Sequence, residues 1–243
     1  MNHLLLAFCT ALAVLSQPLT AQTHANENSA RQMRLEMFVV PDFPGFLRQS
    51  GVREGTVVVA IAHDATGKAS DILVLESTEP RFTEAALDAI RQWRFESPMK
   101  PPVSRDAAVP VVRFLFTSGS VAIVPLALGA YEKSRLPVRA GSPIELPNFG
   151  HCDTEPKALA QPLPKFPAEL KGRVARGMAL VKFFVDETGR ARVPVAIHAT
   201  EPEFGGAAVA AVAQWRFAPP RIDAKPVIVI ETRTFHFGSP DGS

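Results

Sequence analysis

The chain has 243 residues, 47% of them hydrophobic and 21% charged, a composition that is typical of a globular protein. It excludes a disordered or collagen-like chain. The 26 basic and 24 acidic residues nearly balance and form no basic stripe, so the charge gives no reason to expect nucleic-acid binding.

The first 25 residues are typical of a secretory signal peptide. An apolar run of about a dozen residues ends at Leu15, too short to cross a bilayer, and small residues follow at Ala21 and Ala25. We therefore predict that residues 1–25 are removed and that the mature chain is exported. Because the first residues include no Lys or Arg, an uncleaved membrane anchor remains the alternative. After cleavage only Cys152 remains, and this thiol is either buried and inert or joins two chains into a dimer.

Residues 26–37 are mostly polar and are expected to form a flexible lead-in. Phe43 then precedes Pro44, a pattern that predicts a short helix. From residue 55 to 95 the sequence matches residues 177–217 at a constant offset, and 17 of the 41 positions are identical. A period this long indicates a duplicated domain, not a solenoid.

Each copy predicts a strand, a tight hairpin, a return strand and a helix. In the first strand of each copy, alternate side chains point to the same face, and the face that carries Val59 or Val181 is predicted to face the core. The hairpins are Asp-Ala-Thr-Gly from Asp64 and Asp-Glu-Thr-Gly from Asp186. Pro194 removes a donor from the second return strand, which predicts an edge position or a bulge there.

A helix is predicted after Pro80 and again after Pro202, because an apolar stripe recurs at helical spacing. Its members are Phe82, Ala85, Ala86, Ala89, Ile90 and Trp93 in one copy, and Phe204, Ala207, Ala208, Ala211, Val212 and Trp215 in the other. Each unit then closes with a strand, 109–116 and 227–237. The connector between the units is rich in proline, and within it residues 121–124 are apolar enough for an extra strand.

The predicted fold is therefore α+β: two copies of a small, three-stranded, mostly antiparallel sheet with one or two helices packed on one face. The expected domains are 38–117 and 163–238, joined by a connector over 118–162.

Three motifs could suggest other functions. The paired Asp64 and Asp186 hairpins resemble an aspartic-protease signature, which leaves a hydrolase as a minor alternative, although each lies in a turn of a small hairpin. His151, Cys152 and Asp153 are adjacent in a loop and are not expected to converge on a metal or a substrate. Trp-Arg-Phe at the end of each predicted helix is interpreted as core rings with an arginine that supports the helix C-terminus.

The ordered set of a Phe-Pro opening, a Gly-x-Val-x-Val strand, an Asp-x-x-Gly hairpin, an alanine-rich helix and Trp-Arg-Phe resembles the C-terminal domain of TonB, over about 41–117 and 163–238. The resemblance implies a periplasmic location and a grip on short peptides of outer-membrane transporters by strand addition. It implies protein or peptide partners, no catalysis, no cofactor and no metal. A TonB-type transducer also has an uncleaved membrane helix and a long spacer, and neither is seen in this sequence.

Strand addition requires an unpaired sheet edge. The residues expected at the two edges are Val111, Arg113 and Leu115 in the first unit and Val229, Glu231 and Arg233 in the second. The alternative is that one unit or the connector covers these edges. The function predicted from sequence is therefore a periplasmic peptide-binding module. Its alternatives are a structural pseudo-dimer scaffold in an envelope complex, or an energy transducer if the N-terminal segment is an uncleaved inner-membrane anchor.

Overall fold

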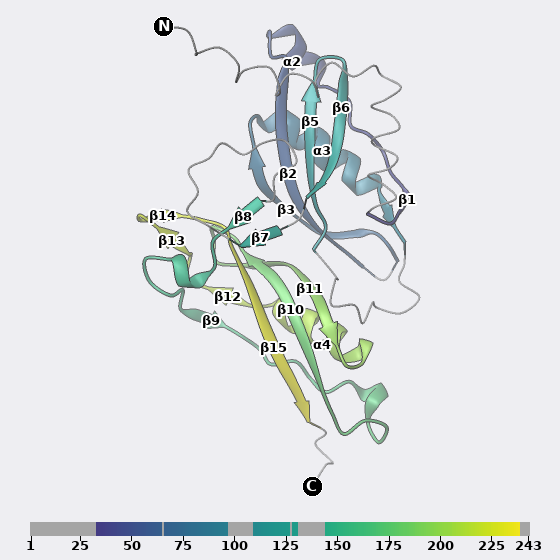
Figure 1. Cartoon of the computed structure of the whole chain (residues 1–243), viewed down its shortest axis with the longest axis vertical. Helices are drawn as coiled ribbons and strands as arrows, with labels where there is room; N and C mark the ends of the chain where they lie inside the picture. The colour runs from purple at the N-terminus through teal and green to yellow at the C-terminus, as the bar shows by residue number, and fades with distance from the viewer. Residues whose placement is uncertain (1–32, 65, 97–108, 127, 131–143, 239–243) are drawn as a thin grey trace, which may run out of the picture.

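The computed structural model describes residues 33–64, 66–96, 109–126, 128–130 and 144–238. Two α+β bodies lie one above the other along the long axis (Figure 1). We call residues 33–126 unit 1 and residues 144–238 unit 2. The α+β class predicted from the sequence is confirmed. The predicted signal peptide lies outside the described residues, and within them no helix is long and apolar enough to span a membrane.

Unit 1 is built on a four-stranded antiparallel sheet in the order β3-β2-β5-β6. The helix α3 packs on one face of this sheet, against β2 and β3. In chain order the elements are β1 (Leu35–Met37), α2 (Gly45–Gln49), β2 (Glu54–His63), β3 (Ala69–Ser77), α3 (Pro80–Gln92), β4 (Arg94–Phe95), β5 (Val111–Thr117) and β6 (Ser120–Leu126).

Unit 2 repeats this plan with one strand fewer, because its sheet has the order β11-β10-β15. Its main elements are η2 (Ala168–Leu170), β10 (Arg176–Val185), β11 (Ala191–Ala199), α4 (Pro202–Val212) and β15 (Val229–Gly238). Smaller elements are η1 (Phe149–His151), β9 (Ala158–Ala160), β12 (Arg216–Phe217), β13 (Arg221–Ile222) and β14 (Lys225–Pro226). β7 (Leu128–Ala130), which lies between the units in the sequence, pairs in parallel with β8 (Ile144–Leu146) at the start of unit 2.

The repeated glycine at the start of the first strand is explained by the helix packing. Phe82 of α3 and Phe204 of α4 are fully buried, and each ring lies directly over a glycine, Gly55 or Gly177. A Cβ at either glycine would overlap the phenylalanine ring. The glycine therefore lets the first turn of the helix approach the sheet closely enough to seal the core.

In each unit a short strand that precedes the main sheet pairs with the strand that follows the helix. Leu35–Met37, in the expected lead-in, pairs as β1 with β4, and Ala158–Ala160, in the expected connector, pairs as β9 with β12. In both units the residues just after this short strand also supply a hydrogen-bond acceptor to the tryptophan that follows the helix. Trp93 Nε1 donates to the carbonyl of Val39 at 2.8 Å, and Trp215 Nε1 donates to that of Pro162 at 3.0 Å.

Pro194 lies at a position where the missing amide N–H donor costs little, because the strand is at the sheet edge and bulges there. β11 is an edge strand of its sheet, and its register with β10 shifts between Lys182 and Phe184, opposite Pro194. The bulge places Val193 at a φ of 48°, a conformation that is rare for a β-branched residue. The prediction of an edge or bulge at Pro194 is confirmed, and it is both.

The two units share a third apolar cluster between their sheets. Val58 and Ala60 on the second face of β2 are fully buried, and so are Phe184 and Val193 of unit 2 in the same cluster. Both faces of β2 are apolar because one face packs under α3 and the other packs against unit 2.

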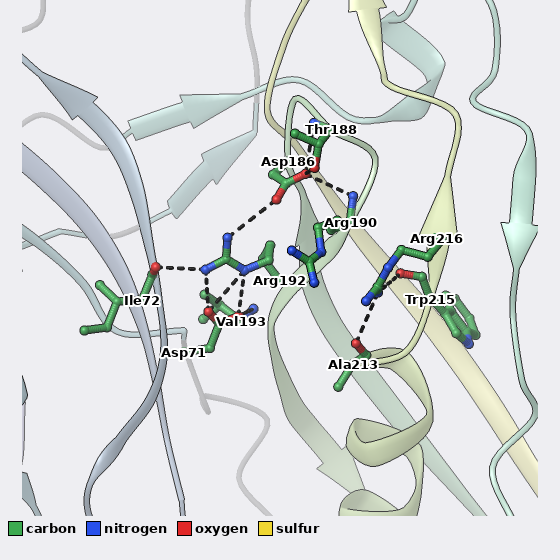
Figure 2. Close-up of polar contacts among 10 residues, drawn as sticks. All are labelled: Asp71, Ile72, Asp186, Thr188, Arg190, Arg192, Val193, Ala213, Trp215 and Arg216. Carbon is green, nitrogen blue, oxygen red and sulfur yellow. Dashed lines mark hydrogen bonds and ion pairs between the residues drawn. The ribbon is translucent and has the colours of Figure 1, made fainter.

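An ion pair lies beside this cluster (Figure 2). The Arg192 guanidinium donates from Nε to both carboxylate oxygens of Asp71 at 3.1 Å, and its Nη2 atom reaches Oδ1 at 2.5 Å. The same Nη2 donates to the carbonyl of Ile72 at 3.0 Å, and the Val193 amide donates to Asp71 Oδ2 at 2.7 Å. Asp71 therefore also holds the strained backbone of the bulge. We call Asp71, Ile72, Arg192 and Val193 the joint.

Candidate functional site

The outer side of β15 is the candidate site, because no described strand pairs with it there. The Ile230 amide donates to the carbonyl of Pro147 at 2.8 Å, away from β10. Because main-chain groups of an antiparallel strand alternate between its two neighbours, those of Thr232, Thr234 and His236 face this same side. All three side chains are exposed. We call the outer side of β15 from Thr232 to Gly238 the open edge.

The side chains beside the open edge differ on the two faces of the sheet. Phe235 and Phe237 point toward the helix face, and Phe237 stacks on Phe204 with ring centroids 4.5 Å apart. Thr232, Thr234 and His236 alternate with them and face the other way. A strand added to this edge would therefore meet aromatic rings on one face and polar groups on the other.

The residues that precede β9 close the open edge at one end. The buried carboxylate of Glu231 accepts the Phe149 amide of η1 at 2.7 Å. Arg233 Nη1 donates to the same carboxylate at 2.8 Å, and its guanidinium lies 5.7 Å from the centre of the Phe149 ring. Glu231 therefore attaches the chain before β9 to β15, and the open edge begins at the next residue.

In unit 1 the corresponding edge is covered. β6 pairs with the whole of β5, from Val111↔Leu126 to Thr117↔Ser120. The prediction that Val111, Arg113 and Leu115 form an open peptide-binding edge was therefore wrong, and the alternative of an edge covered by the connector holds in this unit. The extra strand expected at 121–124 is confirmed as part of β6.

In unit 2 all three predicted residues have side chains on the core-facing side of β15. Val229 is fully buried and Glu231 is bonded to η1, so both precede the open edge, whereas Arg233 lies within it and is partly exposed. Sequence reasoning chose the residues that face the core and missed Thr232, Thr234 and His236, whose main chain faces outward. Along 232–237, threonine and histidine alternate with arginine and phenylalanine, and this alternation was the signal that could have identified them.

Each hairpin aspartate accepts hydrogen bonds from residues of the turn in which it lies. Asp186 Oδ1 accepts the amides of Thr188 and Arg190 at 3.0 Å and the Thr188 hydroxyl at 2.6 Å (Figure 2). Asp64 binds the amides of Thr66 and Lys68 and the Thr66 hydroxyl in the same way. The Thr66 hydroxyl is the main cause that lowers the pKa of Asp64. At Asp186 burial opposes the lowering, but the hydrogen bonds from Thr188 and Arg190 and the charge of Arg192 still lower the pKa. Two ionised carboxylates that each accept hydrogen bonds within their own turn differ from the catalytic dyad of an aspartic protease, in which two aspartates share one proton.

The other candidate motifs also have structural roles. Arg94 Nη1 and Arg216 Nη1 each donate at 2.7 Å to the carbonyl of the preceding tryptophan, and both tryptophan rings are buried, which confirms the structural interpretation of Trp-Arg-Phe. His151 lies beside Asn148 in the turn of η1. Cys152 is half-buried, and burial raises the pKa of its thiol. Among the described residues no group of three His, Cys, Asp or Glu side chains could hold a metal ion.

Comparison with known proteins assigns the two units. The family model described as Gram-negative bacterial TonB protein C-terminal matches residues 41–116 and 162–238. A solution NMR structure of the Pseudomonas aeruginosa TonB CTD is 26% identical, with a TM-score of 0.33, and the match covers 37% of this chain and 93% of that chain. No curated protein matches the chain. Because the family model covers most of the chain in two segments, the protein belongs to the family of the TonB C-terminal domain and matches it twice.

Proposed function

We propose that the protein binds an extended segment of another envelope protein by strand addition at the open edge of unit 2. The observation that carries this proposal is the absence of a described strand beside β15 between Thr232 and Gly238. Unpaired main-chain donors and acceptors are what an incoming strand needs. The family acts through protein interactions in envelope transport, which supports a protein partner.

Segments of outer-membrane transport proteins are the proposed ligands, and the periplasm is the proposed location. Export depends on a signal peptide in residues outside the described ranges. Cell fractionation will test it: a shortened, soluble periplasmic product supports a free binding module, and a full-length membrane-bound product supports an anchored transducer.

The direct test replaces a residue whose amide faces the incoming strand. Thr234→Pro removes that donor, and proline is tolerated on an edge strand when its nitrogen faces outward. The matched control, Thr234→Val, keeps the amide and a β-branched side chain. Peptides from the periplasm-facing segments of outer-membrane receptors will be titrated by calorimetry against the mature chain and both variants.

Proline should weaken binding at least about tenfold, because a strand ladder loses a main-chain hydrogen bond at its centre, and valine should leave binding within about threefold. Equal binding by all three proteins, each confirmed folded by its melting temperature, would show that peptides bind elsewhere.

A second candidate is a scaffold role, favoured by the buried apolar cluster between the units and by the Asp71–Arg192 ion pair. This contact fixes one unit against the other without a ligand. If no extended peptide binds and the chain instead co-purifies in a stable envelope complex whose assembly survives Thr234→Pro, the scaffold is the better account.

A further inference from the structure

The two units differ in the neighbour of their closing strand, and that difference indicates which strand fits the open edge. In unit 1, β6 lies beside β5 in the position where no described strand lies beside β15. The aromatic residues Phe114 and Phe116 of β5 correspond to Phe235 and Phe237 of β15, since all four pack in the helix-side cores. β6 is therefore a covalently attached example of the strand that would fit beside β15.

The pairing of β6 fixes direction and length. β6 runs antiparallel to β5, starting opposite Thr117 and ending opposite Val111. These positions correspond to Gly238 and Thr232 of β15. Beyond Thr232 the carbonyl of Pro147 already takes the Ile230 amide. A strand that pairs as β6 does therefore has its N-terminal end at Gly238 and fits only between Gly238 and Thr232.

The helix-side face of this strand is apolar at two positions. Val121 and Ile123 of β6 lie opposite Phe116 and Phe114 and reduce the exposed fractions of these rings to 1% and 0%. Without such a strand, Phe237 and Phe235 keep 6% and 8% exposed. Two apolar residues, separated by a single residue, would complete this core.

On the opposite face of the sheet, β6 carries apolar residues in unit 1, whereas the open edge of unit 2 carries polar, exposed ones. In β6, Ala122 and Val124 lie opposite Leu115 and Arg113 of β5. In unit 2 the corresponding residues are His236 and Thr234, both exposed. Polar residues on a ligand would keep this face hydrated, whereas apolar ones would be exposed to water.

The last position of the pattern differs in charge between the units. Pro125 of β6 lies opposite the buried Val112, and the corresponding residue of β15 is Arg233, whose side chain is 39% exposed. Arg233 pairs with Glu231 through Nη1. Because a guanidinium carries five N–H donors, this partly exposed group can also bond a ligand carboxylate placed opposite it.

We infer that the open edge selects a short segment of a partner protein that runs antiparallel to β15 in the pattern apolar–polar–apolar–polar–acidic. This inference rests on the proposed strand addition and adds its direction and side-chain code. The occupant is an unstructured segment of another protein, because the pattern combines an apolar alternation with a charge opposite Arg233, which β6 itself lacks.

The test uses the mature chain labelled with nitrogen-15 and the peptide Ser-Val-Thr-Ile-Thr-Glu-Gly, with capped ends. Amide shifts should be largest at Thr232, Thr234 and His236. A spin label at the N-terminal end of the peptide should broaden the amides of Phe237 and Gly238 more than that of Thr232.

Two altered peptides test the side-chain code. The control peptide Ser-Val-Ile-Thr-Thr-Glu-Gly has the same composition but places its two apolar residues on opposite faces. It should bind roughly tenfold more weakly, because only one apolar side chain reaches the rings. Replacing Glu by Lys in the first peptide should weaken binding by about threefold or more, as expected for a partly exposed ion pair.

Each other result has a distinct meaning. Equal binding of the first peptide and the control, indifference to Glu→Lys, or broadening at Thr232 instead of Gly238 would overturn the inferred code and direction, while strand addition would stand. Shifts confined to β5 would show that the peptide displaces β6 in unit 1, and would also overturn the inference. If no peptide, receptor-derived or designed, perturbs residues 232–238, the proposed function fails as well. Concentration-dependent protection of these amides in the chain alone would identify a second copy as the occupant and reject a partner segment.

Discussion

At the residue scale, several duplicated positions are fixed by close packing or by hydrogen bonds within a turn. Gly55 and Gly177 lie under the rings of Phe82 and Phe204, and Asp64 and Asp186 each accept three donors of their own turn. The sequence predicted the turn aspartates and the buried rings, because both are local patterns. It did not predict the contact between glycine and phenylalanine, because that contact joins residues more than twenty positions apart across the sheet.

Gly177→Ala should destabilise the protein by about 1–3 kcal/mol, because the new Cβ overlaps the Phe204 ring and the core must shift. Urea unfolding followed by tryptophan fluorescence measures the loss. Gly206→Ala is the matched control, since Gly206 lies exposed in α4 with no atom within 4 Å of an added Cβ. It should stabilise by about 0.5–1 kcal/mol through helix propensity. A neutral Gly177→Ala would contradict the packing.

Asp186→Asn should lower stability at neutral pH and have a much smaller effect in acid. Although burial opposes it, hydrogen bonds from Thr188 and Arg190 and the charge of Arg192 lower the pKa of Asp186 in the folded state. The carboxylate therefore contributes stability above its unfolded pKa, and this contribution is lost as pH falls through the lower folded pKa. Urea unfolding from pH 7 to pH 2 should show the two proteins converging at the acid end. A constant gap across that range would mean that ionisation of Asp186 is not the cause.

At the element scale, the helices and hairpins followed from the sequence, but the neighbour of each closing strand did not. The apolar run at residues 121–124 predicted a strand, and β6 confirms it. Its pairing with β5 depends on a two-residue turn at Ser118 and Gly119 and on a register that no local pattern encodes. The sequence likewise predicted one core face for β2, but it did not predict that the second face packs against the other unit.

Ala122→Pro should open the edge of unit 1. Ala122 lies opposite Leu115, two positions from the Ser120–Thr117 pair that closes the turn, so its amide faces β5 and proline removes a ladder hydrogen bond. The native Pro125 lies at the alternate position, where the nitrogen faces away. We expect faster amide exchange along β5 and a second peptide site by calorimetry. Unchanged exchange in β5 would show that β6 does not depend on this pairing, and Ala122→Val serves as the control.

At the scale of the whole molecule, the tandem behaves as two units held in one arrangement by an apolar cluster and the joint. Arg192 and Asp71 are each partly exposed, so the ion pair alone contributes little to stability. Asp71 also accepts the Val193 amide in the bulge, so its loss leaves a strained backbone donor without its partner. Composition and periodicity predicted two domains, but charge pairing over so long a separation is fixed only by the docked fold.

Asp71→Ala should therefore destabilise the protein by about 1–3 kcal/mol and loosen the units relative to each other. Residual dipolar couplings measured for each unit should fit one alignment tensor in the native protein and two in the variant. Asp88→Ala removes an exposed i,i+3 partner of Arg91 in α3 and should change stability by less than about 0.5 kcal/mol. One shared tensor and full stability in Asp71→Ala would show that the apolar cluster alone holds the units.

Amide hydrogen exchange of the two closing strands in the mature chain tests the central claim most directly. The claim predicts slow exchange at Leu115, whose amide faces β6, and fast exchange at its counterpart His236 and at Thr234, which face the open edge. A bound receptor segment should then slow exchange at Thr234 and His236 and leave Leu115 unchanged. Equal protection of the two strands before any ligand is added would contradict the account.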